Sequence, residues 1–146
     1  MIVPEASSPP SSSIEIDLLP PRLQGLRALA EKWALFAGFS HLEAGQILAG
    51  VDEALVNIHL HSYGGRQGKV VVEIQKTNHE LIFQFTDYGK SFDPKQGTGR
   101  KPGEIGEGGW GTLIMQHAFP RIERQHLGGD NILLLARPLP VHKGGV

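Results

Sequence analysis

Two polar side chains, Glu53 and Asn57, stand four residues apart in a stretch that otherwise has the pattern of a helix. At about 100° per residue, positions four apart lie only about 40° from each other around a helix, so both side chains share one face. An amide oxygen is a ligand that Mg²⁺ accepts, and a carboxylate can take a proton from a hydroxyl group or orient a water. The pair therefore predicts chemistry at this face, although Glu and Asn at this spacing also occur on ordinary solvated helices.

The helix that carries this pair is predicted to span residues 41–62, because apolar residues recur at the spacing of one helical face and no proline interrupts them. A similar helix at residues 23–36 is expected to precede it and to end before Gly38. Apolar and acidic residues alternate at 14–18, which indicates a short, half-buried strand ahead of both helices.

Two β-hairpins are predicted downstream, from β-branched and aromatic runs separated by turn residues. The first pairs residues 69–76 with 81–86, and the second pairs 122–126 with 132–136 around the glycines of L-G-G-D-N. A short helix is expected between the hairpins and ends before Pro120. Hairpins with segregated helices predict an α+β fold, a two-layer sandwich, rather than a doubly wound parallel sheet.

Composition limits the classes of function that the chain can have. Its 146 residues, 40% of them hydrophobic and 20% charged, fit one globular domain, expected at 14–138 between a disordered tail (1–13) and a flexible tail (139–146). A net charge of -1 without a long basic run disfavours direct binding of nucleic acid or an anionic membrane. The absence of cysteine excludes disulfides, thiolate metal sites and cysteine nucleophiles. With no apolar run long enough for a membrane span and no signal pattern, the expected location is the cytoplasm.

A nucleotide site is predicted where further features converge on the helix face described above. Asp87 ends a predicted strand, where its carboxylate can accept a hydrogen bond from an exocyclic amine such as that of adenine, and Gly89 leaves room for the ring. The glycine-rich segment 95–108 is long enough to be a lid or a binding loop. It leads into a helix start at Gly109, whose unpaired amides and dipole favour phosphate.

Two other patterns are set aside. The G-K-S run at 89–91 resembles the end of a phosphate-binding P-loop, but Gln84 occupies the position where that motif requires its first glycine. His59 and His61 are two residues apart and do not face each other on a helix, so they are not expected to form a metal pair. His61, one turn beyond the asparagine, is placed to brace the site.

Three sequence boxes, in this order, carry a family resemblance. They are E-A-L-V-N-x-x-x-H at 53–61, D-Y-G-K-S-F-D-P at 87–94 and G-E-G-G-W-G at 106–111. They resemble the N, G1 and G2 boxes of the GHKL, or histidine-kinase-like, ATPase superfamily, and are most similar to those of its anti-sigma-factor serine/threonine kinases. The resemblance extends over roughly 19–138. It implies a mixed, mostly antiparallel sheet covered on one face by helices, with ATP under a lid.

The resemblance also implies roles for individual residues. Asn57 is expected to coordinate the Mg²⁺ that bridges the ATP phosphates, and Glu53 to act as general base toward the acceptor hydroxyl. Asp87 is expected to bind the adenine amino group, beside Gly89. The other expected ATP contacts lie in the last box and in the loop before it: Arg100, with Lys101 as the alternative basic residue, and Gly108, Gly109, Gly111 and Thr112.

The function implied by this resemblance is that of a Mg-ATP-dependent protein serine/threonine kinase. Such a kinase binds a sigma factor, phosphorylates a small anti-sigma antagonist and thereby switches partners, and by the same analogy the protein is expected to be a homodimer. Two alternatives stay open. The chain can be a non-catalytic ATP-binding module that only regulates partner affinity, or the detached ATPase domain of a histidine kinase.

Overall fold

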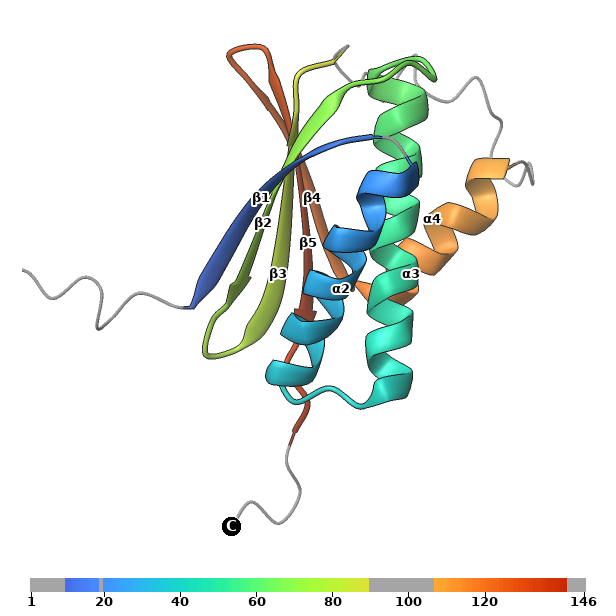
Figure 1. Cartoon of the computed structure of the whole chain (residues 1–146). Coiled ribbons are helices and arrows are strands. Elements are labelled where there is room, and N and C mark those ends of the chain that lie inside the picture. The colour runs from blue at the N-terminus through green and yellow to red at the C-terminus, as the bar shows by residue number, and fades with distance from the viewer. Residues whose placement is uncertain (1–9, 19, 90–106, 142–146) are drawn as a thin grey trace, which may run out of the picture.

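The fold is an α+β two-layer sandwich, described for residues 10–18, 20–89 and 107–141 of this computed structural model (Figure 1). Its elements are, in chain order, β1 (Ser11–Asp17), α2 (Pro20–Phe36), α3 (His41–Asn57), η1 (Ile58–Ser62), β2 (Lys69–Lys76), β3 (Glu80–Asp87), α4 (Glu107–Ala118), β4 (Arg121–Leu127) and β5 (Asp130–Pro138). Figure 1 shows α2, α3 and α4 together on one side of the sheet. The predicted fold class, a sheet covered on one face by helices, is therefore confirmed.

The sheet has the strand order β1-β2-β3-β5-β4, and each neighbouring pair is antiparallel. The prediction of a mixed sheet needs correction, because no parallel pair occurs among the described strands. The reason is that β5 folds back from β4 as a hairpin and continues antiparallel beside β3. This hairpin turns at Gly128 and Gly129, whose φ angles of 58° and 93° suit a tight turn that follows the twist of the strands.

Helix α3 starts at a capping box, which fixes the direction in which the helix leaves its loop. The Glu43 N–H donates to Ser40 Oγ at 3.1 Å, and the Ser40 N–H donates to Glu43 Oε1 at 2.9 Å. The hydrogen bonds from the Ser40 backbone and side chain hold the pKa of Glu43 below its ordinary value. The start of α3 therefore agrees with the predicted start at residue 41.

The end of the predicted helix differs from an α-helix. Regular α geometry stops at Asn57, and Ile58–Ser62 form a π-helical turn, η1, which is closed by a 3.3 Å hydrogen bond from the Tyr63 N–H to the Ile58 carbonyl. A π turn bonds residue i to i+5, so it rotates the side chains that follow it relative to a continued α-helix. Such turns occur frequently at functional sites. Apolar periodicity did not reveal it because only Ile58 of this turn is buried.

The core lies between the sheet and the helices, and α3 and α4 approach each other closely at Gly50. A Cβ atom at Gly50 would overlap the Phe119 ring and the Ala118 side chain. Phe119 in turn meets Phe83 of β3 edge to face, with 5.6 Å between ring centres. The largest fully buried side chains are Phe83, Phe85, Phe119, Leu26, Ile47, Leu55, Ile74, Leu81, Met115, Leu135, Val51 and Val70.

Arg137 of β5 joins the sheet to the helical layer. Its guanidinium donates to the Ala118 carbonyl at 3.3 Å and to Gln46 Oε1 at 3.2 Å, and lies 3.7 Å from the Glu43 carboxylate. The guanidinium carbon is also 5.2 Å from the centre of the Phe39 ring. These contacts connect β5 with the start of α3 and the end of α4.

The described structure extends beyond both predicted domain boundaries, 14 and 138. Strand β1 begins at Ser11, three residues before the predicted boundary, and pairs along β2 from Ser11 opposite Gln75. The serines lack the apolar alternation that marks a strand, but backbone pairing and a 3.1 Å hydrogen bond from Trp33 Nε1 to Ser12 Oγ hold them. At the other end, the Leu139 N–H donates to the His79 carbonyl at 2.9 Å, so residue 139 is fixed to the domain.

Candidate functional site

Asp87, the predicted adenine contact, is a buried carboxylate at the end of β3. It is only 3% exposed and follows the inward-facing residues Phe83 and Phe85 with the period of two of a strand. A buried carboxylate needs hydrogen-bond donors to offset the loss of water. The described residues supply three donors to Asp87, which come from three separate segments of the chain.

The first two donors reach the same carboxylate oxygen. The Gly89 N–H donates to Asp87 Oδ1 at 3.1 Å, which forms a local turn in which an Asp side chain binds its own backbone two residues on. Asn131 Nδ2 donates to the same oxygen at 2.8 Å and to the Gly89 carbonyl at 3.3 Å. Asn131 faces Asp87 directly across the β3–β5 pair, and it is 8% exposed. Strand register therefore sets this contact.

The third donor comes from the π turn. Ser62 Oγ donates to Asp87 Oδ2 at 3.1 Å. A Cβ atom at Gly89 would overlap the Ser62 carbonyl, so glycine is required here by the backbone of η1. The room predicted beside an adenine ring at Gly89 is therefore filled, at least in part, by the end of this turn.

Tyr63 joins the strands beside this carboxylate. Its hydroxyl donates to the Lys69 carbonyl at 2.6 Å and accepts from the Tyr88 N–H at 3.0 Å. Burial raises the pKa of Tyr63, which keeps the phenol protonated and able to donate. The start of β2 and the end of β3 are thus held together without use of the Asp87 side chain.

Glu53 and Asn57 lie on α3 as predicted, one turn apart and both half-buried. Neither side chain has a hydrogen bond or an ion pair with another described residue. Ser62 follows Asn57 by about one further turn, so the helix face and the Asp87 carboxylate belong to the same end of α3. A carboxylate and an amide oxygen are therefore available for a ligand near a buried acceptor.

Gly111 of α4 contacts the Glu53 side chain. It is buried, and a Cβ atom at this position would overlap the Glu53 carboxylate. Gly111 was predicted to pack against phosphates at the helix start, but α4 already begins at Glu107 and Gly111 lies in its second turn. The structure therefore brings Gly111 to the predicted general base.

The other predicted contacts are only partly described. Gly108 and Gly109 lie in the first turn of α4, and Thr112 is exposed on the same helix. Arg100 and its alternative Lys101 lie outside the described residues. His61 is exposed at η1, and Nδ1 of its neighbour His59 is buried without a hydrogen-bond partner among the described residues.

Asp52, the carboxylate next to Glu53, serves a different contact. Its Oδ1 lies 3.4 Å from Arg27 Nε of α2. Burial raises the pKa of Asp52, and the nearby Arg27 charge partly opposes this shift. Asp52 therefore belongs to the packing of α2 on α3, which makes it a useful control residue for Glu53.

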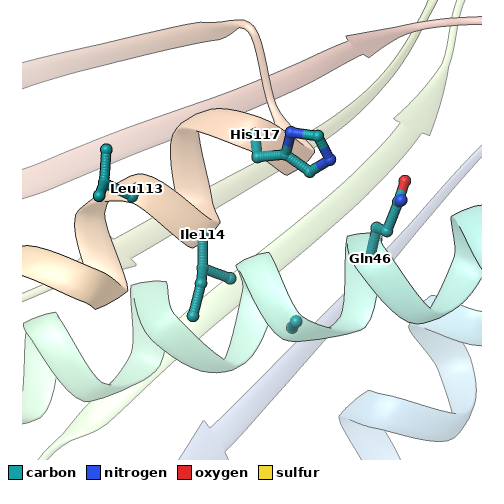
Figure 2. A pocket seen from close by; sticks show the side chains of 5 residues that line it. Gln46, Leu113, Ile114 and His117 are labelled. Atoms are coloured by element: carbon teal, nitrogen blue, oxygen red, sulfur yellow. The ribbon is translucent and has the colours of Figure 1, made fainter.

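A shallow groove of about 260 Å³ lies between α3 and α4. Figure 2 shows Gln46 rising from α3 and Leu113, Ile114 and His117 from α4. Ala49 completes the lining. None of the candidate site residues that the structure describes lines this groove.

Sequence reasoning missed Ser62 and Asn131, which donate to the Asp87 carboxylate, and His126, which contacts Asn131. Ser62 reaches it only through the π turn, which periodicity does not reveal. Asn131 did carry a signal, because it has the same alternation phase as Leu133 and Leu135 and is therefore a polar residue at an inward-facing position. The predicted strand starts at 132, two residues after the observed start at Asp130, and so leaves Asn131 in the turn.

Within the residues that the structure describes, no helix combines the length and the apolar character that crossing a membrane requires. The same ranges contain no group of three or more His, Asp or Glu side chains arranged to hold a metal ion.

Family comparison agrees with this geometry. Residues 16–137 match the model of the histidine kinase-like ATPase domain, and since this is most of the chain, the protein belongs to that family. The resemblance carried by the three boxes is thereby confirmed for the superfamily. No curated protein sequence matches the chain.

One solved structure with a similar fold is "The crystal structure of the RsbU and RsbW domains of Rv1364c from Mycobacterium tuberculosis". The TM-score is 0.60 at 18% sequence identity. The alignment covers 88% of this chain and 32% of the other, so this chain spans about a third of its length. At this identity the similarity shows a shared fold.

Proposed function

We propose that this protein is a Mg-ATP-dependent protein serine/threonine kinase that acts in the cytoplasm as an anti-sigma regulatory factor. The observation that carries the proposal is the face of α3 on which Glu53 and Asn57 stand one turn apart, without partners among the described residues. The buried Asp87 acceptor lies beyond the same end of that helix. These are the groups that bind an adenine nucleotide and prepare a hydroxyl for attack.

Asn57 fits a magnesium ion that accompanies ATP. Its side chain is half-buried and free of protein hydrogen bonds among the described residues, and its amide oxygen is a neutral, hard ligand of the kind Mg²⁺ accepts. Mg²⁺ usually takes one or two protein ligands and completes its shell with phosphate and water oxygens. Bound there, the ion supplies compensation for the negative charge of the phosphates.

Glu53 is the proposed general base. Its carboxylate takes the proton of the acceptor serine or threonine hydroxyl, while that oxygen bonds to the γ-phosphorus and the bond from phosphorus to the bridging oxygen breaks. The products are the phosphorylated acceptor, ADP and protonated Glu53, which returns its proton to solvent. Asp87 accepts a hydrogen bond from the adenine amino group. The glycines Gly108 and Gly109, with Arg100 or Lys101, contact the phosphates.

The proposed partners are a small anti-sigma antagonist, which is the phosphoacceptor, and a sigma factor, bound by a homodimer of this chain. The support is the fold shared with a protein whose described domains include an RsbW domain, together with the resemblance of the three boxes. Light scattering of the purified protein at micromolar concentration tests the dimer directly.

The deciding experiment measures transfer of labelled γ-phosphate from Mg-ATP to candidate antagonist proteins of the same organism. Glu53→Gln should bind ATP with wild-type affinity but transfer phosphate about 10²-fold more slowly or worse, as expected for loss of a general base. Asp52→Asn is the matched control, because it removes the neighbouring carboxylate and should leave the transfer rate unchanged. Equal transfer by Glu53→Gln and wild type contradicts the base assignment.

The chemical nature of the phosphorylated product distinguishes the proposed kinase from the two alternative functions. An acid-stable phosphoserine or phosphothreonine supports the kinase proposed here, whereas an acid-labile phosphohistidine indicates a histidine-kinase domain. ATP binding that changes partner affinity without any transfer indicates a regulatory module. Each result assigns the chain to one of these three classes.

A further inference from the structure

Two residues outside the three boxes, Ser62 and Asn131, surround the Asp87 carboxylate. An ionised carboxylate has two oxygens with about four lone-pair positions and accepts hydrogen bonds without donating any. Gly89 and Asn131 both donate to Oδ1, which accounts for its two positions, and Ser62 donates to Oδ2. Among the described residues, Oδ2 thus has one donor and room for one more.

The orientation of the Asn131 amide follows from its neighbours. Its Nδ2 faces two acceptors, the Asp87 carboxylate and the Gly89 carbonyl, and only an amide nitrogen can donate to both. Its Oδ1 therefore faces His126, whose Nδ1 lies 2.9 Å away and must carry the proton in this bond. Asn131 is thus fixed on both sides, and it holds Asp87 in one rotamer.

We propose that Ser62 and Asn131 are positioning residues that make Asp87 a pure acceptor with one open position on Oδ2, and that they thereby set the preference for a 6-amino over a 6-oxo purine. This inference rests on the proposed binding of an adenine nucleotide and adds the residues that determine base selectivity. An amino group at purine position 6 donates into the open position of Oδ2. An oxo group there presents a second acceptor to a carboxylate that has no proton to give.

Each residue acts on selectivity in its own way. With Ser62→Ala, water can take the vacated position on Oδ2, and since water donates as well as accepts, it can bridge to a 6-oxo group. With Asn131→Asp, two buried carboxylates face each other and share a proton. A carboxyl that carries this proton can donate to the oxo group. Both changes therefore weaken discrimination at position 6.

The test compares dissociation constants of Mg-ATP and Mg-ITP, which differ by the amino or oxo group at position 6 and by the proton that the 6-oxo base carries on the adjacent N1. Calorimetry on the wild type should give ATP at least about tenfold tighter binding than ITP, because a buried acceptor is left unpaired by the wrong base. Ser62→Ala and Asn131→Asp should each lower this ratio about fivefold or more. Tyr63→Phe, which removes two hydrogen bonds at the same corner of the sheet but none to Asp87, should keep the wild-type ratio.

The ratio separates positioning from general destabilisation, which weakens both nucleotides alike. Unchanged ratios in Ser62→Ala and in folded Asn131→Asp overturn the inference while nucleotide binding stands. If Asn131→Asp does not fold, Ser62→Ala decides by itself. Equal wild-type affinity for ATP and ITP also overturns the inference, and a folded wild type that binds neither at millimolar concentration overturns the proposed function with it.

Discussion

The contact of Gly111 with Glu53 predicts that Gly111→Ala separates catalysis from stability. The added methyl group overlaps the Glu53 carboxylate, which is the end of a flexible side chain without partners among the described residues. Moving it costs about 0.5–1.5 kcal/mol in rotamer energy. Replacing glycine by alanine inside a helix stabilises the helix by about 1 kcal/mol, which offsets this cost. The free energy of unfolding should therefore stay within about 1 kcal/mol of the wild type.

Phosphate transfer should respond very differently, because Glu53 is the proposed general base and a misplaced base loses most of its contribution. A displacement of about 1 Å costs roughly 10²-fold in rate. We expect Gly111→Ala to slow transfer to the antagonist about 10²-fold while the dissociation constant of Mg-ATP changes less than about threefold. Urea denaturation, calorimetry and the labelled-phosphate assay measure the three quantities on one preparation.

Gly50→Ala is the matched control on the same helix pair. Its methyl group overlaps the Phe119 ring, which is fully buried and cannot move aside. Overpacking of this kind costs about 1–3 kcal/mol, so this variant should lose stability but transfer phosphate normally per folded molecule. Wild-type transfer by Gly111→Ala would refute the idea that α4 sets the position of the base.

Three further predictions concern magnesium, pH and the sheet. Asn57→Ala should bind ATP equally with and without Mg²⁺ in calorimetry; a persisting magnesium effect contradicts its role as a ligand. Hydrogen bonds from Arg121 hold the pKa of Glu80 below its ordinary value of 4.5, so Glu80 adds stability above that pH and loses it as pH falls through the lowered value. Urea midpoints should therefore show the wild type more stable than Glu80→Gln at pH 7, with the difference shrinking below pH 4.5. Arg137→Met should lower the free energy of unfolding by about 2 kcal/mol, because it removes charged hydrogen bonds to Ala118 and Gln46; a change within about 0.5 kcal/mol contradicts this account.

The layers of the fold could be predicted because apolar residues recur at helical spacing in the helices and at strand spacing in the hairpins. The face of α3 and the hairpin that turns at Gly128 and Gly129 follow from spacing and turn chemistry alone. The start of β1 could not be predicted in this way, since its serines are held by pairing with a distant strand. Nor could the π turn, because the sequence after Asn57 keeps no apolar pattern to show a change of phase.

The sequence predicted a candidate residue correctly in position where its side-chain type alone suggested a role. The helix and strand predictions placed Glu53 and Asn57 on α3 and Asp87 at the end of β3, as the structure has them. The contacts that hold Asp87 were not found, because they depend on the register between β3 and β5, and register is a property of two strands together. A polar residue at an inward-facing strand position, such as Asn131, is the signal that would have pointed to this network.

The position of β5 has a consequence for folding of the chain during its synthesis on the ribosome. This strand, the last one that the structure describes, inserts between β3 and β4, and it carries the asparagine that holds Asp87. A nascent chain that lacks β5 has neither the strand that joins β3 to β4 nor the hydrogen bond from Asn131 to Asp87. In the proposed nucleotide site, recognition of the base therefore requires that β5 has been synthesised and paired, and chains that end before Asp130 cannot compete for the ligand.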